Sequence, residues 1–320
     1  MKESAQIYDV GVVGAGAAGM VAAIAAARAG VSVCLIERGQ RLGSKVAITG
    51  GGRCNIMNAV CDASAYHPMH AAFFDTVFAR FGKAEMRTFF DDLGLPTVTE
   101  EDGRVFPRCG QAASVVRVLE DELRRLGVRI YAQREITDLR RERGVMACVS
   151  AQGNIQARRV IVAAGGKSYP ALGSNGSGYA LAQDLGHTTV MPVPSGVPLV
   201  VSDRMVHMFQ GQRVDALLVG CVNGVEVIRA RGDLLFANYG LSGTAAIDVS
   251  EPLSVAWERD GCGDVSVIID LLPDMSEAAL AAEFSRRVVR GFSAQQMTAG
   301  LLPNKFDALF EKMFQTVSSA

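Results

Sequence analysis

The pattern of hydrophobic and polar positions in the first forty residues predicts a strand, a helix and a second strand. An apolar run at residues 8–13 is typical of a buried strand, and it leads directly into the glycine-rich segment of residues 14–19. An alanine-rich helix is predicted after it and ends at Gly30. A second apolar strand, residues 31–36, ends at Glu37. This order of elements predicts a βαβ unit.

The glycine spacing in this unit is that of the dinucleotide-binding fingerprint G-x-G-x-x-G, which gains its meaning from a preceding strand and a following helix. Gly14 permits a tight turn, Gly16 leaves room for a pyrophosphate, and Gly19 lets the helix pack close to the sheet. Backbone N–H groups at the helix start, around Ala15 and Ala17, are expected to face the phosphates. Glu37, 18 residues after Gly19, is expected to accept hydrogen bonds from a ribose diol. A turn without a ligand is the alternative, and the acidic end of the second strand argues against it.

Further elements follow from the same patterns. Residues 70–94 have apolar and aromatic positions near helical spacing, including Phe73, Val77, Phe81, Phe89 and Phe90, which we interpret as core. The remaining expectations in this half are a hairpin around residues 102–103, a helix at 111–126, strands at 128–131, near Ile136 and at 145–150, a buried strand at 158–164 that ends at residues 165–166, and a helix at 179–185.

The character of the sequence changes near residue 192, where three prolines within seven residues predict a domain boundary. Short β-like runs dominate residues 193–272, and residues 276–317 are predicted to be helical with a break around 300–303. The predicted domains are therefore a dinucleotide-binding domain at 1–192, a β-rich domain at 193–272 and a helical part at 273–320.

Composition narrows the class of protein. The chain has 320 residues and a formal net charge of −1, which predicts no nucleic-acid or membrane partner. Its seven cysteines form no CxxC pair, and no secretion signal precedes the first strand, so a reducing cytoplasm is expected. His67, His70 and His207 lack metal-ligand spacing, so no metal site is predicted.

Five segments together extend beyond a generic nucleotide-binding fold. They are the GAGAAG turn with Glu37, TGGGRCNIMN (49–58), EEDGRVFPR (100–108), VIVAAGGKSYPALGSNGSGYALAQDLGH (160–187) and LLFANYGLSGTAAIDVS (234–250). This set resembles the YhiN/BaiN-like family of NAD(P)/FAD-dependent oxidoreductases, some of which are labelled aminoacetone oxidases. The resemblance implies an α/β flavoprotein with a doubly wound, Rossmann-like FAD-binding domain, into which a β-rich domain with a small helical subdomain is inserted. It also implies an FAD-dependent oxidoreductase of a small organic substrate, with NAD(P)H as a candidate electron donor.

The TGGGRCN segment makes physical sense beside a flavin. Residues 50–52, all glycine, let the backbone lie against a flat ligand, and Arg53 supplies a cation for phosphate or for the reduced flavin anion. Asn55 can donate to and accept from ring edges; loop-fixing hydrogen bonds are the alternative for Arg53 and Asn55. Cys54 is better interpreted as a packed thiol than as a redox residue. The complete set of predicted FAD-binding residues is Gly14, Ala15, Gly16, Ala17, Gly19, Glu37, Arg38, Gly51, Gly52, Arg53, Cys54, Asn55, Ile136, Ala164 and Gly165.

No general acid or base is assigned. Family members usually end with a further segment that contains a GLYFAGE-like strand, and this motif is not found before the final VSSA. From the resemblance we therefore expect weaker FAD retention, and the alternative function is a dinucleotide-binding or interaction module with impaired catalysis. A flavin-dependent tRNA-modifying protein is a third interpretation, which the near-zero net charge and the lack of a basic stripe disfavour.

Overall fold

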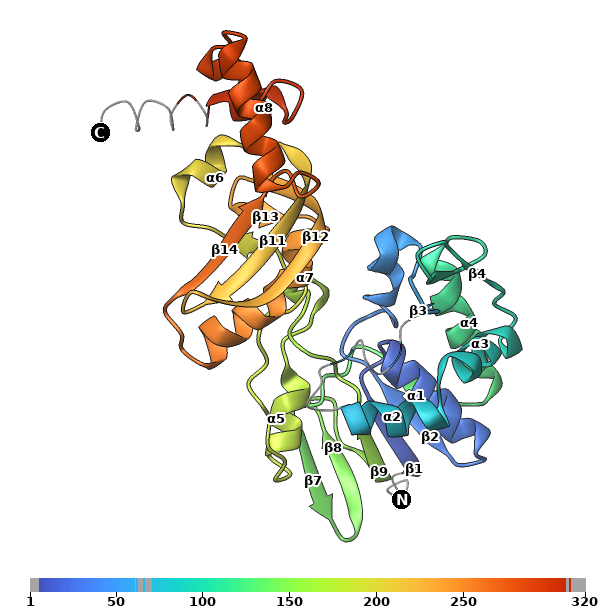
Figure 1. Ribbon diagram of the computed structural model, residues 1–320. Coiled ribbons are helices and arrows are strands. Elements are labelled where there is room, and N and C mark those ends of the chain that lie inside the picture. The colour runs from blue at the N-terminus through green and yellow to red at the C-terminus, as the bar shows by residue number, and fades with distance from the viewer. Residues whose placement is uncertain (1–5, 61, 63–65, 67–70, 309–310, 312–320) are drawn as a thin grey trace. The chain divides into compact units, whose positions relative to one another are not determined.

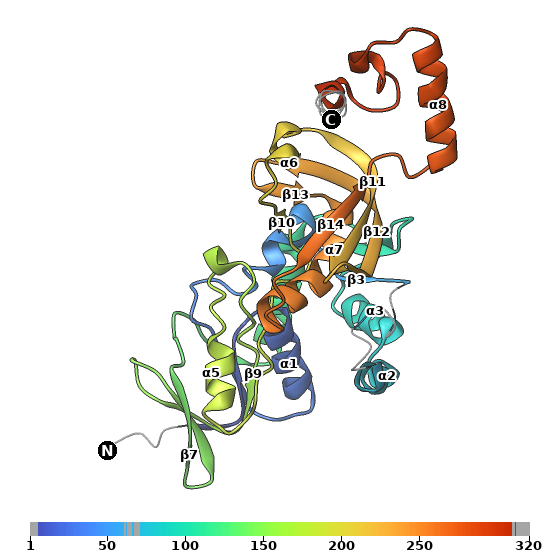
Figure 2. The ribbon, with the colours of Figure 1, turned by 60° about the vertical axis from the view of Figure 1, so that its left-hand side comes forward.

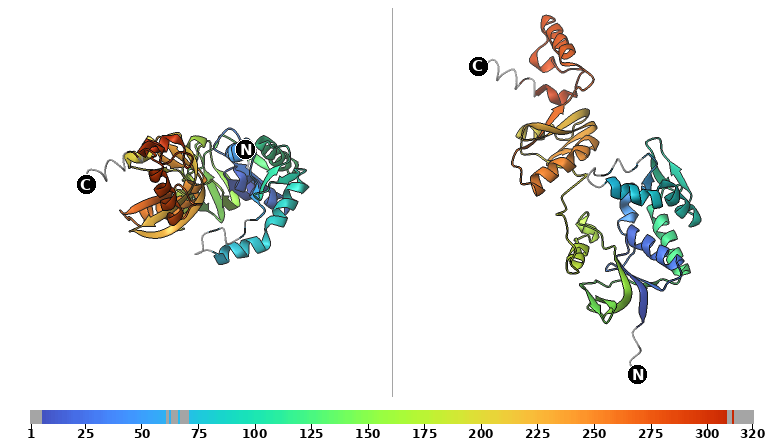
Figure 3. Two further views of the ribbon diagram at one scale, coloured as in Figure 1. Left: turned by 45° about the horizontal axis from the view of Figure 1, so that its top comes forward. Right: turned by 60° about the horizontal axis from the view of Figure 1, so that its bottom comes forward.

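The computed structural model describes residues 6–60, 62, 66, 71–308 and 311 (Figure 1). The chain divides into two compact units, Met1–Thr189 and Val190–Ala320, which are called unit 1 and unit 2. Views from other sides show that each unit has its own sheet and its own helices (Figures 2 and 3). The three predicted domains, with boundaries at 192 and 272, stay a prediction.

The sheet of unit 1 has six strands within the described residues, in the order β6-β2-β1-β9-β8-β7. β1, β2, β6 and β9 run parallel to one another, and β8 and β7 continue the sheet as an antiparallel hairpin. The bounds are β1 Ile7–Val13, β2 Val33–Ile36, β6 Arg129–Tyr131, β7 Asp138–Glu142, β8 Val145–Val149 and β9 Ile155–Val162. The predicted strand, helix and strand order is confirmed, with α1 at Ala17–Arg28 between β1 and β2. The α/β, Rossmann-like fold class is likewise confirmed.

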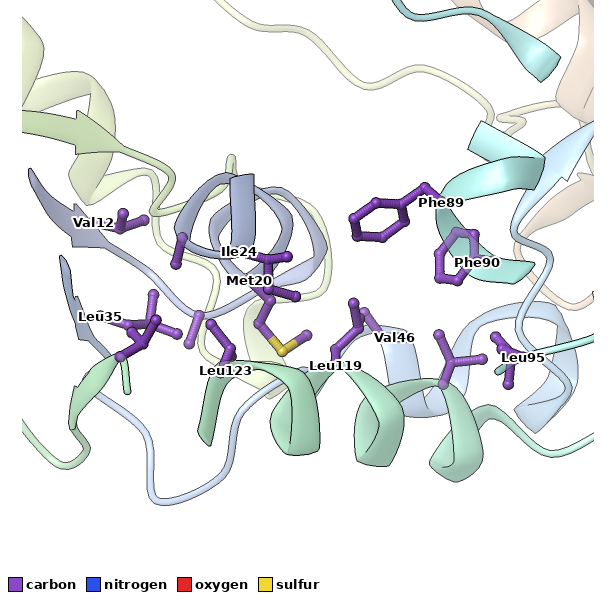
Figure 4. Packing of buried hydrophobic residues seen from close by; sticks show 14 of the residues in the cluster. Val12, Met20, Ile24, Leu35, Val46, Phe89, Phe90, Leu95, Leu119 and Leu123 are labelled. Carbon is purple, nitrogen blue, oxygen red and sulfur yellow. The ribbon is translucent and has the colours of Figure 1, made fainter. Parts of the chain in front are cut away.

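Strand β2 is apolar and buried throughout because both of its faces are covered. On one face, Val12 and Leu35 pack into a core with α1 and with α4, Ala112–Arg125. Figure 4 shows Met20 and Ile24 of α1 beside Leu119 and Leu123 of α4. On the other face, Tyr8, Cys34 and Ile36 belong to a second core. The two cores therefore hold β1 and β2 in place, and with them the edge of the sheet at which these strands end.

The aromatic positions between residues 70 and 94 form two helices, α2 at Ala71–Arg80 and α3 at Lys83–Asp92. Gly82 breaks the run because its N–H donates to Glu85 at 2.8 Å and starts α3. Phe89 and Phe90 lie in the core, as predicted. The core interpretation is wrong for Phe73, Val77 and Phe81, which are 64%, 40% and 41% exposed. Helical spacing identifies one face of a helix, but it does not show that another element covers that face.

Two smaller corrections concern the edges of the sheet in unit 1. The strand predicted at 158–164 is β9, and its carboxyl half is not buried, since Ile161 and Val162 are more than a third exposed. The strand expected near Ile136 begins two residues later, at Asp138. A short sheet of β3 Met57–Asn58, β5 Arg104–Pro107 and β4 Thr97–Thr99 contains the predicted hairpin. Helix α5, Ser177–Gln183, begins two residues before its predicted start.

Unit 2 is built on an antiparallel sheet, with the order β10-β13-β12-β11-β14 among the residues described. The bounds are β10 Leu199–Val200, β11 Arg213–Val222, β12 Val225–Ala237, β13 Gly240–Ser242 and β14 Val265–Asp270. Helix α7, Thr244–Ser254, packs on β11 and β12 (Figure 2). The β-like description of 193–272 is wrong for α7 and for the shorter α6, Arg204–Met208. Ala245, Ala246, Val249 and Leu253 are buried at helical spacing, so the sequence carried this signal.

The helical end of unit 2 agrees in part with the prediction. Helix α8 spans Glu277–Val289, and short helical turns follow at Ala294–Gln296 and Asn304–Phe306. Phe306 is fully buried and stacks on Phe209 with 4.4 Å between the ring centroids, which attaches this end of the chain to the core of unit 2. The predicted helical residues 309–310 and 312–317 lie outside the described part of the chain.

Glu122 on α4 connects α4 to α1 through ionic hydrogen bonds. Its carboxylate is nearly buried and accepts from Arg28 at 2.8 and 3.0 Å and from Arg125 at 2.6 and 2.9 Å. These guanidinium groups, Arg125 first, lower the pKa of Glu122 from 4.5 to about 2. A carboxyl group with a lowered folded-state pKa stabilises the fold above its unfolded pKa, and this stabilisation is lost as the pH falls toward the folded pKa.

We predict that Glu122→Gln lowers the free energy of unfolding by about 1–3 kcal/mol near pH 7, because two cations lose a nearly buried partner. Urea unfolding monitored by circular dichroism measures the effect. The difference from the parent should shrink as the pH falls from about 4.5 toward 2. Glu120→Gln is the matched control on α4, since Glu120 pairs with the exposed Arg124, at 2.8 Å. Equal losses in both variants would contradict the prediction.

Candidate functional site

The carboxyl ends of β1, β2 and β9 meet at one edge of the sheet in unit 1. β1 and β2 lead into Gly14 and Glu37, and β9 leads into residues 163–165. This edge, between the neighbouring strands β1 and β9, is where chain connections leave in different directions and where ligands bind in open α/β sheets. A pocket there is lined by Val13, Gly14, Ile36, Glu37, Arg38, Arg134, Glu135, Ile136, Ala164, Ser177 and Leu181. Five predicted site residues from four separate segments therefore come together: Gly14, Glu37, Arg38, Ile136 and Ala164.

The fingerprint glycines do not have equivalent roles in the fold. Gly14 has φ +100°, and a Cβ there would lie 2.4 Å from the carbonyl oxygen of Ala163. A Cβ on Gly19 would lie 1.8 Å from the carbonyl oxygen of Gly14. Position 19 therefore requires glycine for α1 to pack against the end of β1, and position 14 requires it for the exit of β9 to lie beside this end.

Gly16 is different, because neither its conformation nor its packing requires glycine. Its φ of −74° and ψ of −172° suit any residue, and a Cβ there would meet no described atom within 4 Å. Gly16 is the N-cap of α1, where unpaired N–H groups and the helix dipole favour an anion. The open space in front of Gly16 fits a phosphate group that approaches the backbone closely.

The Glu37 carboxylate lies beside the fingerprint turn. One oxygen accepts from the N–H of Ala15 and the other from the N–H of Gly39, each at 2.7 Å. These bonds connect the end of β2 to the start of α1. Each carboxylate oxygen has two acceptor positions, so the group retains capacity for hydroxyl donors. The structure thus shows Glu37 at the fingerprint turn, and its predicted contact with a ribose stays a prediction.

Residues 134–136 form a further part of the pocket lining. The backbone N–H of Glu37 donates to Tyr131, and its carbonyl oxygen accepts from the N–H of Arg134. Arg38 lies 3.7 Å from the carboxylate of Glu135, and Ile136 is buried. Arg134, Glu135, Ser177 and Leu181 line the pocket but were not among the predicted residues. Only Ser177 carried a signal, since GSNGSG predicted a helix start beside the strand exit.

The TGGGRCN segment does not line this pocket. It forms a kinked helical turn, Val46–Gly52, in which residues 50–52 have positive φ. Cβ atoms on Gly51 and Gly52 would meet no described atom, whereas one on Gly50 would lie 2.8 Å from the backbone nitrogen of Asn55. Gly51 and Gly52 therefore present open backbone, whereas Gly50, which was expected to do the same, is required by the turn.

Arg53 and Cys54 have structural contacts in this segment. The Arg53 guanidinium forms an ion pair with Glu100 and lies 3.9 Å from the centroid of the Phe106 ring. These contacts agree with the loop-fixing alternative. Cys54 is buried with φ +65°, and burial raises the pKa of its thiol, as expected for a packed residue. Asn55 is exposed.

Two features are absent from the described residues, a metal site and a membrane-spanning helix. No group of three His, Cys, Asp or Glu side chains among them is placed to hold a metal ion. No helix in the described ranges is long and apolar enough to cross a bilayer. Cys61, His67 and His70 lie outside these ranges.

Comparison with known proteins finds relatives that match most of the chain. A family profile described as "HI0933-like protein Rossmann domain" matches residues 8–300. The chain is 35% identical over 301 residues to the 3-dehydro-bile acid delta(4,6)-reductase of Clostridium scindens, a match that covers 92% of this chain and 73% of the relative. It is 29% identical over 273 residues to the ribosomal RNA dihydrouridine synthase of Escherichia coli, over 84% of this chain and 64% of the relative.

A weaker likeness is found among solved structures. The 3-ketosteroid-delta4-(5alpha)-dehydrogenase from Rhodococcus jostii RHA1 is 16% identical with a TM-score of 0.43, over 70% of this chain and 61% of that chain. The family match extends over most of the sequence and confirms the resemblance that the motifs indicated. The chain belongs to the HI0933-like family of flavoprotein oxidoreductases.

Proposed function

We propose that unit 1 binds FAD at the carboxyl edge of its sheet and that the protein oxidises or reduces a small organic substrate. The observation that carries the proposal is the open space at Gly16, in a turn where Gly14 and Gly19 are needed for packing and Gly16 is not. A glycine without a structural requirement at a helix N-terminus is expected where a ligand phosphate comes close to the backbone. The family match supports a flavin as that ligand.

The predicted residues divide between the two ends of the cofactor. Residues 14–19 and the N-terminus of α1 would hold the pyrophosphate, and Glu37 would accept hydrogen bonds from the adenosine ribose. Ile136 offers an apolar wall beside them, and Arg38 adds a cation at the same pocket. Gly51, Gly52, Arg53, Cys54 and Asn55 would lie toward the flavin, with Ala164 and Gly165 at the strand exit between the two groups.

The protein's own contribution is to bind, orient and shield. When bound, FAD supplies the group that accepts or donates a hydride. The hydrogen bonds of Glu37 to Ala15 and Gly39 hold the turn in the shape that the phosphates require. The ion pair of Arg53 with Glu100 holds the TGGGRCN turn, so that the backbone of Gly51 and Gly52 stays exposed.

The substrate is proposed to be a small molecule. The relative at 35% identity is a bile acid reductase, whereas the ribosomal RNA dihydrouridine synthase matches at 29%. The net charge of −1 and the pairing of exposed arginines argue against a large anionic partner. Arg158 pairs with Asp9, Arg229 with Glu226, and Arg231 with Asp215 and Asp274. A cytoplasmic location is proposed with it, since Cys34 and Cys148 are buried free thiols.

The FAD assignment is tested with Gly16→Val. A branched side chain would occupy the space where the pyrophosphate must lie, so we predict at least a tenfold loss of FAD affinity, or about 1.4 kcal/mol. The free energy of unfolding without ligand should fall by less than about 1 kcal/mol, because the substitution only replaces a glycine N-cap. Flavin fluorescence titration and urea unfolding measure the two quantities.

The control for Gly16→Val is Gly263→Val in unit 2. Gly263 also faces open space, and its φ lies outside the left-handed region. This variant should bind FAD as the parent does. If Gly16→Val binds FAD as tightly as Gly263→Val, the pyrophosphate does not lie at the fingerprint turn.

NAD(P)H is proposed as the electron donor. We predict that anaerobic addition of NADH or NADPH to the FAD-loaded protein bleaches the flavin absorbance near 450 nm, as expected for hydride transfer to a flavin. The measurement is a stopped-flow absorbance trace, with dithionite reduction as the reference for complete bleaching. If dithionite bleaches the flavin and neither nucleotide does, another donor must be sought while the FAD assignment stands.

A further inference from the structure

Lys45 is a cation at the ligand edge of unit 1 that was not among the predicted site residues. It directly precedes the turn Val46–Gly52, and the residue is half-buried. Within the described part of the chain, its ammonium makes no hydrogen bond and no ion pair. Because a lysine without a partner is common near a protein surface, the role of Lys45 depends on where its ammonium lies.

The backbone around Lys45 is fixed against the fingerprint turn. The N–H of Gly43 donates to the carbonyl oxygen of Ala15 at 2.8 Å, and the N–H of Ala47 donates to Gly43 at 2.9 Å. The N–H of Thr49 then donates to the carbonyl oxygen of Lys45 at 3.2 Å. The Lys45 backbone is therefore held two residues from a direct contact with the segment that starts α1.

The side chain of Lys45 extends to the exit of β9. A Cβ built on Gly165 would lie 3.5 Å from the Lys45 Nζ. The same exit touches the fingerprint turn, since a Cβ on Gly14 would lie 2.8 Å from the Cα of Ala164. The ammonium thus lies where the segment after β2 and the exit of β9 come together beside the fingerprint turn.

Other cations near this edge have different contacts. Arg38 has Glu135 as its partner at 3.7 Å, and Arg53 has Glu100. The carbon stem of Lys167 lies against Gly176, where a Cβ would come within 3.0 Å of it. Lys45 therefore combines an unpaired charge with a position at the junction of the β9 exit and the fingerprint segment.

We propose that Lys45 is a positioning residue that pairs with the pyrophosphate of the bound FAD, an inference that rests on the proposed function. A pyrophosphate carries two negative charges, whereas the N-terminus of α1 offers only about half a positive charge and its N–H groups. Lys45 adds a full charge on a flexible stem, which can follow the phosphate oxygens. The cofactor would then be held from both sides, by α1 and by the segment after β2.

The experiment compares Lys45→Met, Lys45→Arg and Lys83→Met by FAD titration at low and high salt. Lys83 is exposed at the start of α3, so Lys83→Met removes the same charge from unit 1 at a distance from the pocket lining. Loss of a charge-assisted hydrogen bond predicts about ten- to a hundredfold weaker FAD binding for Lys45→Met at low salt. Lys45→Arg should stay within a few-fold of the parent, and Lys83→Met should match it.

The salt dependence of FAD affinity distinguishes an ionic role of Lys45 from a structural one. Because salt screens exposed charges, the parent's FAD affinity should fall more steeply with ionic strength than that of Lys45→Met. Thermal melting without ligand should be the same for all variants, since Lys45 has no partner to lose. Lys45→Met binding within threefold of the parent, or an equal loss at every salt concentration, overturns the role of Lys45. Failure of the parent to bind FAD would instead overturn the proposed function.

Discussion

The close packing of the first turn of α1 on the end of β1 is the constraint on which the site in unit 1 depends. No side chain fits between them, since a Cβ on Gly19 would lie 1.8 Å from the carbonyl oxygen of Gly14. This contact aims the N-terminus of α1 at the carboxyl edge of the sheet. Glu37 then joins the end of β2 to the same turn through Ala15. The apolar faces of β1 and β2 hold the arrangement in place from both sides.

The packing of the protein explains two of the three glycines in the fingerprint motif but not the third. Gly14 and Gly19 are explained by the packing of the protein alone, whereas Gly16 is not. A motif match treats the three glycines alike, and only coordinates distinguish them. A ligand is therefore indicated by the glycine that the fold does not need and by Lys45 nearby, whose ammonium pairs with no residue in the described ranges. Arg53 and Cys54 differ from Gly16, because contacts inside the protein already explain them. Arg53 contacts Glu100 and Phe106, and Cys54 is buried.

Local signals predicted much of the fold and part of the site. The βαβ unit, α4 and the hairpin of β4 and β5 follow from hydrophobic period and turn residues, which act over a few positions. The exposure of Phe73, Val77 and Phe81 was not predictable, because it depends on whether a distant element covers α2. The position of the Lys45 ammonium was not predictable either, since it lies near Gly165, which is 120 residues away in the sequence. Helix α7 was missed although its buried positions have helical spacing, because alternating strands surround it.

A crystal structure of the protein with FAD is the most direct test of the account. The account predicts that the pyrophosphate lies within hydrogen-bond distance of the backbone of Gly16, with a ribose hydroxyl on the carboxylate of Glu37. It also predicts that the fold of residues 14–19 is unchanged, since the turn is already shaped by Gly14 and Gly19. FAD bound at another place, or a pyrophosphate separated from Gly16 by protein side chains, would contradict the account.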